Sequence, residues 1–260
     1  MTGKNVKITD LIDFAKKNGL TVKSQDEIAS EAIDSITKKY NYGIEQIKLN
    51  FDRLLDETEQ GGYRIYLEHE KEFGKSVFEL FIKKLKDDGE LNSLEETGKV
   101  LGGYFRLFDK FFLSLAQSRK SRAGKSFENF HNSLFKSLNY PFDYQKIING
   151  KPDFLMPSVK HYRENPIDCI IFTAKRTLRE RWRQIVTEGT RGLGFFLATI
   201  DDKVSDGQLK EMLDHRIYLV VPQRIKKENY KKSRNVLNFT QFFRDHLDPA
   251  MKRWKYNKVI

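Results

Sequence analysis

The second half of the chain contains four short apolar runs, and this feature constrains the fold more than any other. The runs occupy residues 154–156, 169–173, 193–200 and 217–221. Segments with the periodicity of helices separate the last three runs, at 177–188 and 205–213. Strands that are apolar along their whole length and alternate with helices form sheets that are covered on both faces. The sequence therefore predicts an α/β fold with a mixed β-sheet flanked by helices.

The first 118 residues have helical periodicity instead. Ser24 followed by Glu27 has the spacing of a capping box, and the next apolar residues recur on one helical face. The following apolar stripe is expected to end at the glycine pair 61–62, since glycine disfavours a helix interior. Ser93 with Glu96 has the spacing of a second capping box, which would begin another long helix.

The change of pattern near residue 118 predicts two units. We divide the chain into an all-helical N-terminal domain, 1–118, and an α/β domain, 119–260. A helix at 125–139 is expected to begin the second domain. A chain of 260 residues with 20 Phe is long and apolar enough to build two domains of ordinary size.

Composition and charge limit the class of protein. Lys and Arg outnumber Asp and Glu by 47 to 36, a net charge of +11, which favours nucleic acid as a partner before a membrane surface. A basic protein without any such partner would have the same composition. The single cysteine, Cys169, excludes an internal disulfide, suits a reducing compartment and lies in an apolar run typical of a buried thiol. Because no apolar stretch reaches 18 residues and no signal-peptide core occurs, we expect a cytoplasmic protein without a membrane partner.

Several other kinds of site have little support in the sequence. The segment 119–126 contains Gly-Lys-Ser, but Arg119 stands where a phosphate-binding loop needs its first glycine. The five histidines have no close pairing of the kind that binds zinc. A Ser–His–Asp triad stays open, although no nucleophile-elbow pattern points to one.

Three charged residues form the strongest candidate site. Asp153 begins one apolar run, Lys175 ends the next, and Glu188 follows on the predicted helix. Adjacent strand ends could bring Asp153 and Lys175 together, and two carboxylates near a backbone carbonyl suit Mg²⁺. A lysine beside that metal can orient or deprotonate water and offset charge on a phosphate, as phosphodiester hydrolysis requires. The alternative is structural: a capped turn, a lysine at a strand end and a solvated glutamate.

These residues resemble the catalytic core of the PD-(D/E)xK nucleases. Pro-Asp at 152–153, Lys175 and Glu188 match the motif, but Thr173 stands where the second acid usually lies, two residues before the lysine. With the acid moved to the helix, the arrangement is similar to the restriction endonucleases of the EcoRII and PspGI group. "KSRAGKSFE" (120–128), "KPDFLMPS" (151–158), "AKRTLRERWRQI" (174–185) and "HRIYLVVP" (215–222) extend the resemblance over roughly 118–245.

The resemblance implies further site residues. It adds Glu128 to Asp153 and Glu188 as a metal ligand, although Glu128 adjoins an apolar helical face and a structural role is open. Arg179, Glu180 and Arg181 match a base-reading triplet that follows the family's catalytic lysine. In the major groove, arginine donates two hydrogen bonds to guanine and glutamate accepts one from cytosine, which suits neighbouring C·G pairs. The alternative for this triplet is a charged, solvated helix face.

The resemblance thus implies a Mg²⁺-dependent type II restriction endonuclease that acts on double-stranded DNA. The expected target is a palindrome containing CC and GG, of the CCGG, CCWGG or CCNGG type, cut by a homodimer or higher homo-oligomer. The N-terminal domain would mediate dimerisation or embrace the DNA. Two alternatives remain: a sequence-specific DNA-binding protein without cleavage, and a repair or structure-specific nuclease on the same fold.

Overall fold

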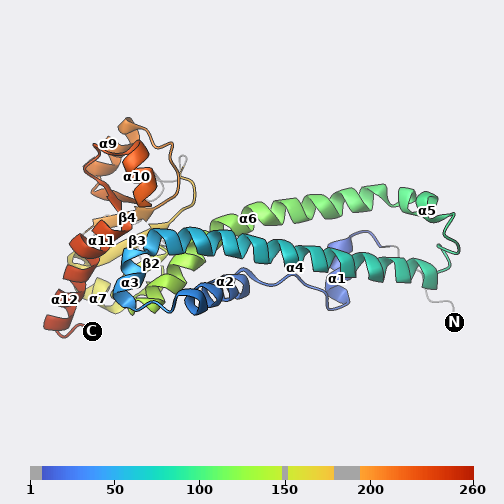
Figure 1. The fold of residues 1–260 in the computed structure, drawn as a ribbon, viewed down its shortest axis with the longest axis horizontal. Coiled ribbons are helices and arrows are strands. Elements are labelled where there is room, and N and C mark those ends of the chain that lie inside the picture. Colours follow the sequence, from blue (N-terminus) through green and yellow to red (C-terminus); the bar gives the residue numbers. More distant parts are fainter. Residues whose placement is uncertain (1–7, 148–151, 179–193) are drawn as a thin grey trace.

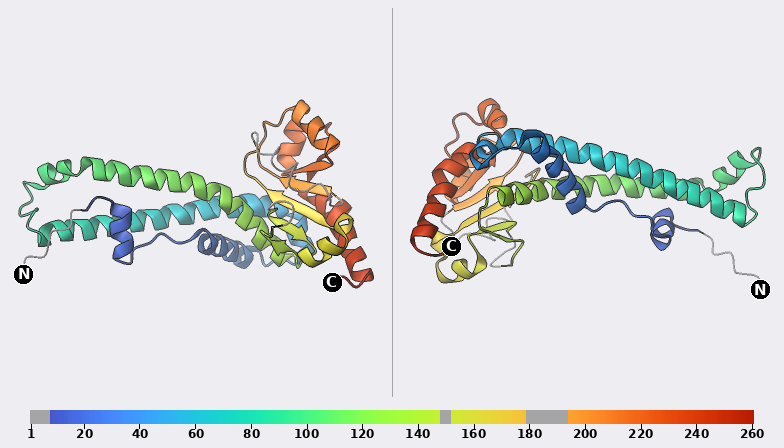
Figure 2. Two further views of the ribbon diagram at one scale, coloured as in Figure 1. Left: turned by 180° about the vertical axis from the view of Figure 1, so that it is seen from behind. Right: turned by 60° about the horizontal axis from the view of Figure 1, so that its bottom comes forward.

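A computed structural model of the chain describes residues 8–147, 152–178 and 194–260. Within these ranges, no helix combines the length and the apolar composition that a membrane span requires. Figure 1 shows an α/β body at one end, and a long helical arm that extends away from it. The further views in Figure 2 show the same arrangement from behind and from below.

Among the described residues, six helices precede the sheet. They are α1 (Leu11–Lys17), α2 (Gln25–Tyr40), α3 (Ile44–Leu49), α4 (Phe51–Asp87), α5 (Thr97–Gly103) and α6 (Phe105–Ser137). Helices α4 and α6 form the arm, with α5 at its far tip (Figure 1). A separate cluster of apolar side chains stabilises this part, and it includes Leu11, Phe73, Phe81 and Phe111.

The predicted break at residues 61–62 is wrong. Helix α4 continues through both glycines for 37 residues. A Cβ atom at Gly62 would lie 2.8 Å from Cζ of Phe130 on α6, a distance that side chains do not tolerate. The glycine therefore allows the two helices to approach closely, and its signal in the sequence comes from packing rather than from a helix end.

The two predicted capping boxes have different outcomes. The first is confirmed, because the Glu27 backbone nitrogen donates to Ser24 Oγ and the Ser24 nitrogen donates to Glu27 Oε2. The second is wrong, since α5 begins after Glu96 with no side-chain cap. The helix predicted at 125–139 is the C-terminal part of α6, which crosses residue 118 without a break.

The predicted mixed sheet is confirmed. Its strands are β1 (Asp143–Tyr144), β2 (Phe154–Met156), β3 (Ile170–Ala174), β4 (Gly194–Ala198), β5 (Ile217–Val221) and β6 (Val236–Asn238). They lie side by side in chain order. The pairs β1–β2 and β2–β3 are antiparallel, and the remaining neighbours are parallel. The sequence pattern missed β1 and β6, which have two and three residues and lie outside the four apolar runs.

Shorter helices connect and follow these strands. They are α7 (Val159–Glu164), the 3₁₀ turn η1 (Pro166–Asp168), α9 (Asp206–Asp214), α10 (Gln223–Asn229), α11 (Phe239–Phe242), the π-helical turn η2 (Phe243–Leu247) and α12 (Asp248–Tyr256). A second apolar cluster, on one side of the sheet, joins Leu155, Ile171 and Leu219 to Leu209 and Met212 of α9.

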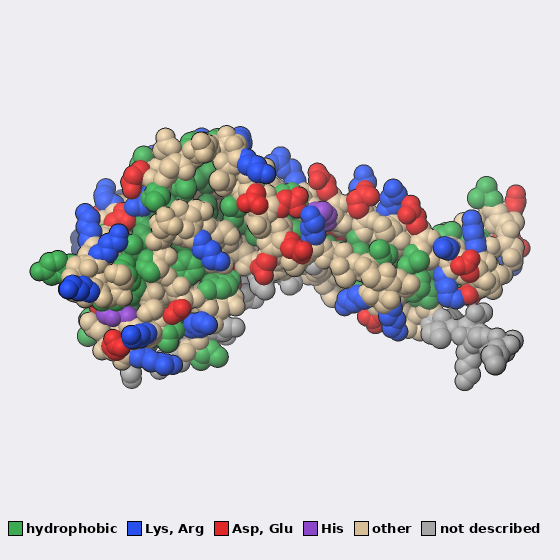
Figure 3. Space-filling view, turned by 90° about the horizontal axis from the view of Figure 1, so that it is seen from below, with side chains coloured by type: hydrophobic (Ala, Val, Ile, Leu, Met, Phe, Trp, Pro, Cys, Tyr) green, Lys and Arg blue, Asp and Glu red, His purple; other side chains and the backbone are tan. Residues whose placement is uncertain are grey.

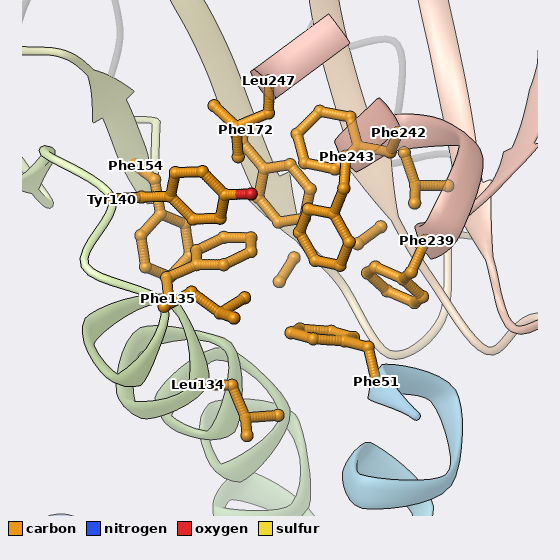
Figure 4. Close-up of a cluster of buried hydrophobic side chains, with 14 of the residues drawn as sticks. Phe51, Leu134, Phe135, Tyr140, Phe154, Phe172, Phe239, Phe242, Phe243 and Leu247 are labelled. Carbon is orange, nitrogen blue, oxygen red and sulfur yellow. The ribbon is translucent and has the colours of Figure 1, made fainter. Parts of the chain in front are cut away.

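The main core lies on the other side of the sheet and is rich in aromatic rings (Figure 4). Phe135 of α6 lies 5.0 Å from Phe172 of β3, and Phe51 of α4 lies 4.7 Å from Phe239, measured between ring centroids. Residues from α2 and α4 belong to the same cluster. The division at residue 118 stays a prediction, and the core is continuous across it.

Candidate active site

Asp153 and Lys175 meet as predicted. The Lys175 ammonium nitrogen lies 3.0 Å from Oδ2 and 3.2 Å from Oδ1 of Asp153. The backbone nitrogen of Ala174 donates a further hydrogen bond of 2.8 Å to Oδ2. Asp153 is only 4% exposed, whereas a third of the Lys175 side chain is accessible. The lysine can therefore contact a ligand while the buried carboxylate holds it in place.

The antiparallel pairing of β2 and β3 explains this contact. Phe154, at the start of β2, pairs with Phe172 in the middle of β3. Asp153 directly precedes β2 and Lys175 directly follows β3, so both residues lie at the same edge of the sheet. The Lys175 backbone nitrogen donates to the carbonyl oxygen of Ala198, which extends the ladder to β4 and fixes the position of the lysine.

Thr173 lies two residues before Lys175, at the position where the PD-(D/E)xK motif has its second acid. It is 3% exposed, and its hydroxyl oxygen lies 3.5 Å from the backbone nitrogen of Asp153. A carboxylate is thus absent from this position, and Glu128 supplies negative charge from another element. Glu128 lies on α6, is 8% exposed, and accepts hydrogen bonds from Tyr144 and Gln145.

The surroundings of Asp153 disfavour the ionised form of its carboxyl group. Burial raises the pKa of Asp153 to about 6, although the charge of Lys175 opposes this rise. The nearby carboxylate of Glu128 raises the pKa further. The charge of Lys175 therefore does not fully offset the burial of Asp153, and an additional positive charge would favour the ionised form of Asp153.

This donor set fits Mg²⁺. Carboxylate oxygens are the protein ligands that the ion prefers, and it commonly uses one or two of them together with water and substrate phosphates. Asp153 and Glu128 can each offer a buried carboxylate, although no group of three potential metal ligands occurs in the described part of the chain. The third predicted ligand, Glu188, lies outside the described residues.

The predicted base-reading residues Arg179, Glu180 and Arg181 also lie outside the described residues. The structure corrects the predicted start of their helix, because positions 177 and 178 are not helical. The Leu178 backbone nitrogen donates a hydrogen bond of 2.9 Å to Asp201 Oδ2.

The adjoining residue Arg176 is fixed in a similar way. Its guanidinium forms an ion pair with Glu59 of α4, and its carbonyl oxygen accepts a hydrogen bond of 3.1 Å from the Thr199 hydroxyl. Contacts to neighbouring segments thus hold the chain in a non-helical conformation directly after Lys175.

Sequence reasoning missed the groups that surround Glu128. Tyr144 is the last residue of β1, Gln145 directly follows it, and Asn129 follows Glu128 on α6. None belongs to a motif, and a strand of two residues gives no periodic signal. The prediction for Cys169 is confirmed: it is fully buried, and burial raises the pKa of its thiol to about 12.

Comparisons with known proteins identify relatives of this chain. The model of the family described as EcoRII C terminal matches residues 95–243. The type II restriction enzyme SsoII of Shigella sonnei is 33% identical over 152 residues, which are 54% of this chain and 50% of SsoII. The type II restriction enzyme EcoRII of Escherichia coli is 38% identical over 128 residues, 45% of this chain and 31% of EcoRII. The chain thus spans half or less of the length of these curated relatives.

Solved structures extend the likeness to nearly the whole chain. Metal-depleted Ecl18kI in complex with uncleaved DNA has a TM-score of 0.74 and 25% identity, covering 93% of this chain and 82% of that one. The complex of restriction endonuclease PspGI with substrate DNA has a TM-score of 0.61 and 21% identity, and the match covers 95% of this chain and 98% of the PspGI chain. The predicted restriction-endonuclease-like fold is therefore confirmed. Since the family model matches more than half of the chain, this protein belongs to the EcoRII C-terminal family.

Proposed function

We propose that this protein is a type II restriction endonuclease, which hydrolyses double-stranded DNA at a defined palindromic site with Mg²⁺. The observation that carries the proposal is the contact of 3.0 Å between Lys175 and Asp153, beside the buried acid Glu128. A protein that only binds DNA has no need of a lysine held at a buried pair of carboxylates. The names of the relatives and the DNA in the solved complexes support the same activity.

Asp153 and Glu128 would hold the Mg²⁺ ion, together with Glu188. When bound, the ion supplies a Lewis acid that polarises the scissile phosphate and lowers the pKa of water. Asp153 has a second task, because its carboxylate holds the ammonium group of Lys175 in place at the sheet edge.

Lys175 would act directly on the reacting groups. An ammonium group has three N–H donors, and Asp153 leaves part of this capacity for another acceptor. We assign that capacity to the attacking water and to a non-bridging phosphate oxygen, where it offsets negative charge in the transition state. Breaking the P–O3′ bond then leaves a 5′-phosphate and a 3′-hydroxyl.

Arg179, Glu180 and Arg181 would read the bases. They begin four positions after Lys175, so the reading group and the cleaving group lie on one short segment. The hydrogen-bonding capacity of two arginines and one glutamate fits two neighbouring C·G pairs. A palindrome containing CC and GG requires two such segments, which a homodimer would supply through its two-fold symmetry.

The charge distribution also bears on the DNA partner. The face in Figure 3 has Lys and Arg interspersed with Asp and Glu, so the net charge of +11 does not form one large patch there. Specific binding would therefore depend strongly on positioned contacts near the active site, in addition to general attraction to phosphate.

Digestion of a plasmid of known sequence with Mg²⁺, followed by mapping of the ends, tests the proposal. Discrete fragments with 5′-phosphates at one recurring palindrome would support it. Protection of a site without cutting would indicate a DNA-binding protein, and nicking that depends on DNA structure would indicate a repair nuclease. Either of these results would overturn the proposed function.

A further inference from the structure

Glu128 is held by a small group of polar side chains that the mechanism above does not use. The Tyr144 hydroxyl donates a hydrogen bond of 2.6 Å to Glu128 Oε1. The side-chain amide of Gln145 donates to the same oxygen. In the described part of the chain, both hydrogen bonds reach Oε1, so the second oxygen of this carboxylate is the one assigned to a metal ion.

The backbone fixes the two donors relative to Asp153. Tyr144 pairs with Phe154 in the β1–β2 ladder, one position from Asp153. The Gln145 backbone nitrogen donates a hydrogen bond of 2.8 Å to the carbonyl oxygen of Asp153. One short strand therefore positions the partners of Glu128 and also contacts the neighbouring acid, so the two carboxylates share a common support.

Gln145 has an unusual conformation that bears on this role. Its φ of 52° lies in the left-handed region, which residues other than glycine and asparagine seldom adopt. Such a conformation is strained and persists where the surroundings require it. Here it turns the chain at the end of β1 while the side-chain amide reaches Glu128.

The group continues into the N-terminal helices. The Tyr144 hydroxyl also lies 3.2 Å from Oδ1 of Asn129, but its hydrogen belongs to the nearer oxygen, Glu128 Oε1. The Asn129 side-chain amide donates a hydrogen bond of 2.7 Å to Oδ1 of Asp26, in the first turn of α2. Asn129 is 4% exposed, so this contact is well shielded from water.

We propose that Tyr144 and Gln145 are positioning residues that orient Glu128 for the metal ion, and that Asn129 and Asp26 tie this group to helix α2. The inference rests on the proposed nuclease function, because it assigns Glu128 to the metal site. A carboxylate held by two donors at one oxygen presents the other in a fixed direction. Loss of a donor releases the carboxylate and weakens metal binding, as the loss of hydrogen-bond partners of metal ligands typically does.

Tyr144→Phe is the decisive variant, since it removes the hydroxyl and keeps the ring, whose centroid lies 5.3 Å from that of Phe154. Gln145→Met is the second, because it removes the amide with little change in length. Tyr140→Phe is the matched control: the Tyr140 hydroxyl donates a hydrogen bond of 2.7 Å to Asp248, a tyrosine–carboxylate pair outside the site.

The readout is the binding of Mn²⁺ to the full-length protein with duplex DNA, measured by titration calorimetry without reliance on cleavage. Tyr144→Phe and Gln145→Met should each weaken Mn²⁺ binding by about 10-fold or more, and Tyr140→Phe should not. In cleavage assays, excess Mg²⁺ should restore much of the rate in the first two variants. Such a rescue would place the defect in the metal requirement and not in folding.

A double-mutant cycle identifies the residue through which Tyr144 acts. If Tyr144 works through Glu128, adding Tyr144→Phe to Glu128→Gln should cause little further loss of Mn²⁺ affinity. Wild-type Mn²⁺ affinity in Tyr144→Phe and Gln145→Met, or additive losses in the cycle, would overturn the positioning role even if the wild type cuts DNA. Absence of Mn²⁺ binding by the wild type would overturn the role together with the proposed function.

Discussion

The Lys175 ammonium nitrogen lies 3.0 Å from Oδ2 of Asp153, across the antiparallel pair of strands β2 and β3. Asp153 is buried, and burial raises its pKa to about 6 in spite of the lysine. Ionisation of Asp153 therefore destabilises the fold, although the proposed function requires the ionised form. Its removal should affect stability and activity in opposite directions.

Asp153→Asn should abolish cleavage and stabilise the fold above pH 7. The folded-state pKa of Asp153 lies above its ordinary value of 3.8, so ionisation disfavours the folded state at high pH and ceases to do so below about pH 4. The gain in the free energy of unfolding should reach up to about 3 kcal/mol at pH 8 and decline to zero near pH 4. Thermal unfolding of both proteins across this range checks it, and a variant less stable than the wild type at pH 8 would contradict it.

His131 predicts a second dependence on pH. Its Nδ1 lies 2.7 Å from the carbonyl oxygen of Phe127, its Nε2 has no partner within the described residues, and burial lowers its pKa to about 4. Because the unfolded chain takes up this proton first, stability is lost as the pH falls from about 6.5 to about 4. The loss should amount to about 3 kcal/mol.

His131→Phe should remove this part of the pH dependence, since phenylalanine does not titrate and the site is already lined by aromatic rings such as Phe51 and Phe172. Denaturant unfolding of both proteins between pH 4 and pH 7 gives the comparison. Parallel curves for the two proteins would mean that His131 does not titrate in this way.

The sequence predicted those features that depend on local pattern. Asp153 and Lys175 each adjoin an apolar run, and two antiparallel strands that share an edge bring such positions together. The glycine signal at residue 62 misled the helix prediction because it reflects contact with Phe130, from a distant segment. Long-range contacts of this kind leave no periodicity in the sequence.

The rest of the site depends on tertiary contacts. Glu128 was identified through resemblance alone, since nothing in a long helix marks one acid as part of a site. Tyr144 and Gln145 reach it from the edge of the sheet, and their role follows only from the strand pairing and the hydrogen bonds. Residues that act through another residue are the least visible in a single sequence.

Arg179 and Arg181 should carry sequence specificity. Replacing either with alanine should cost about 1–3 kcal/mol per C·G pair, or roughly 2–6 kcal/mol of specific affinity in a two-fold dimer if the losses add. Affinity for unrelated DNA should change far less, because phosphate contacts supply most of it. Glu180→Gln should relax discrimination more than it weakens binding.

Binding of each variant to a cognate and a scrambled duplex, at one salt concentration, measures these losses. Arg224→Ala is the matched control, since Arg224 is an exposed arginine outside the triplet, paired with Glu228. Equal losses on both duplexes for Arg179→Ala and Arg181→Ala would assign these residues to phosphate contacts, and the bases would be read elsewhere.

The most direct test of the central claim is the single-turnover rate of cleavage by Lys175→Ala, on a duplex that contains the site mapped for the wild type. Loss of a group that offsets transition-state charge should lower this rate by roughly 10²–10³-fold or more at saturating Mg²⁺. Specific binding of the same duplex in Ca²⁺ should persist. The Lys175 side chain is one-third accessible, and removing this side chain leaves the strands intact. A rate close to that of the wild type would contradict the assignment of the active site.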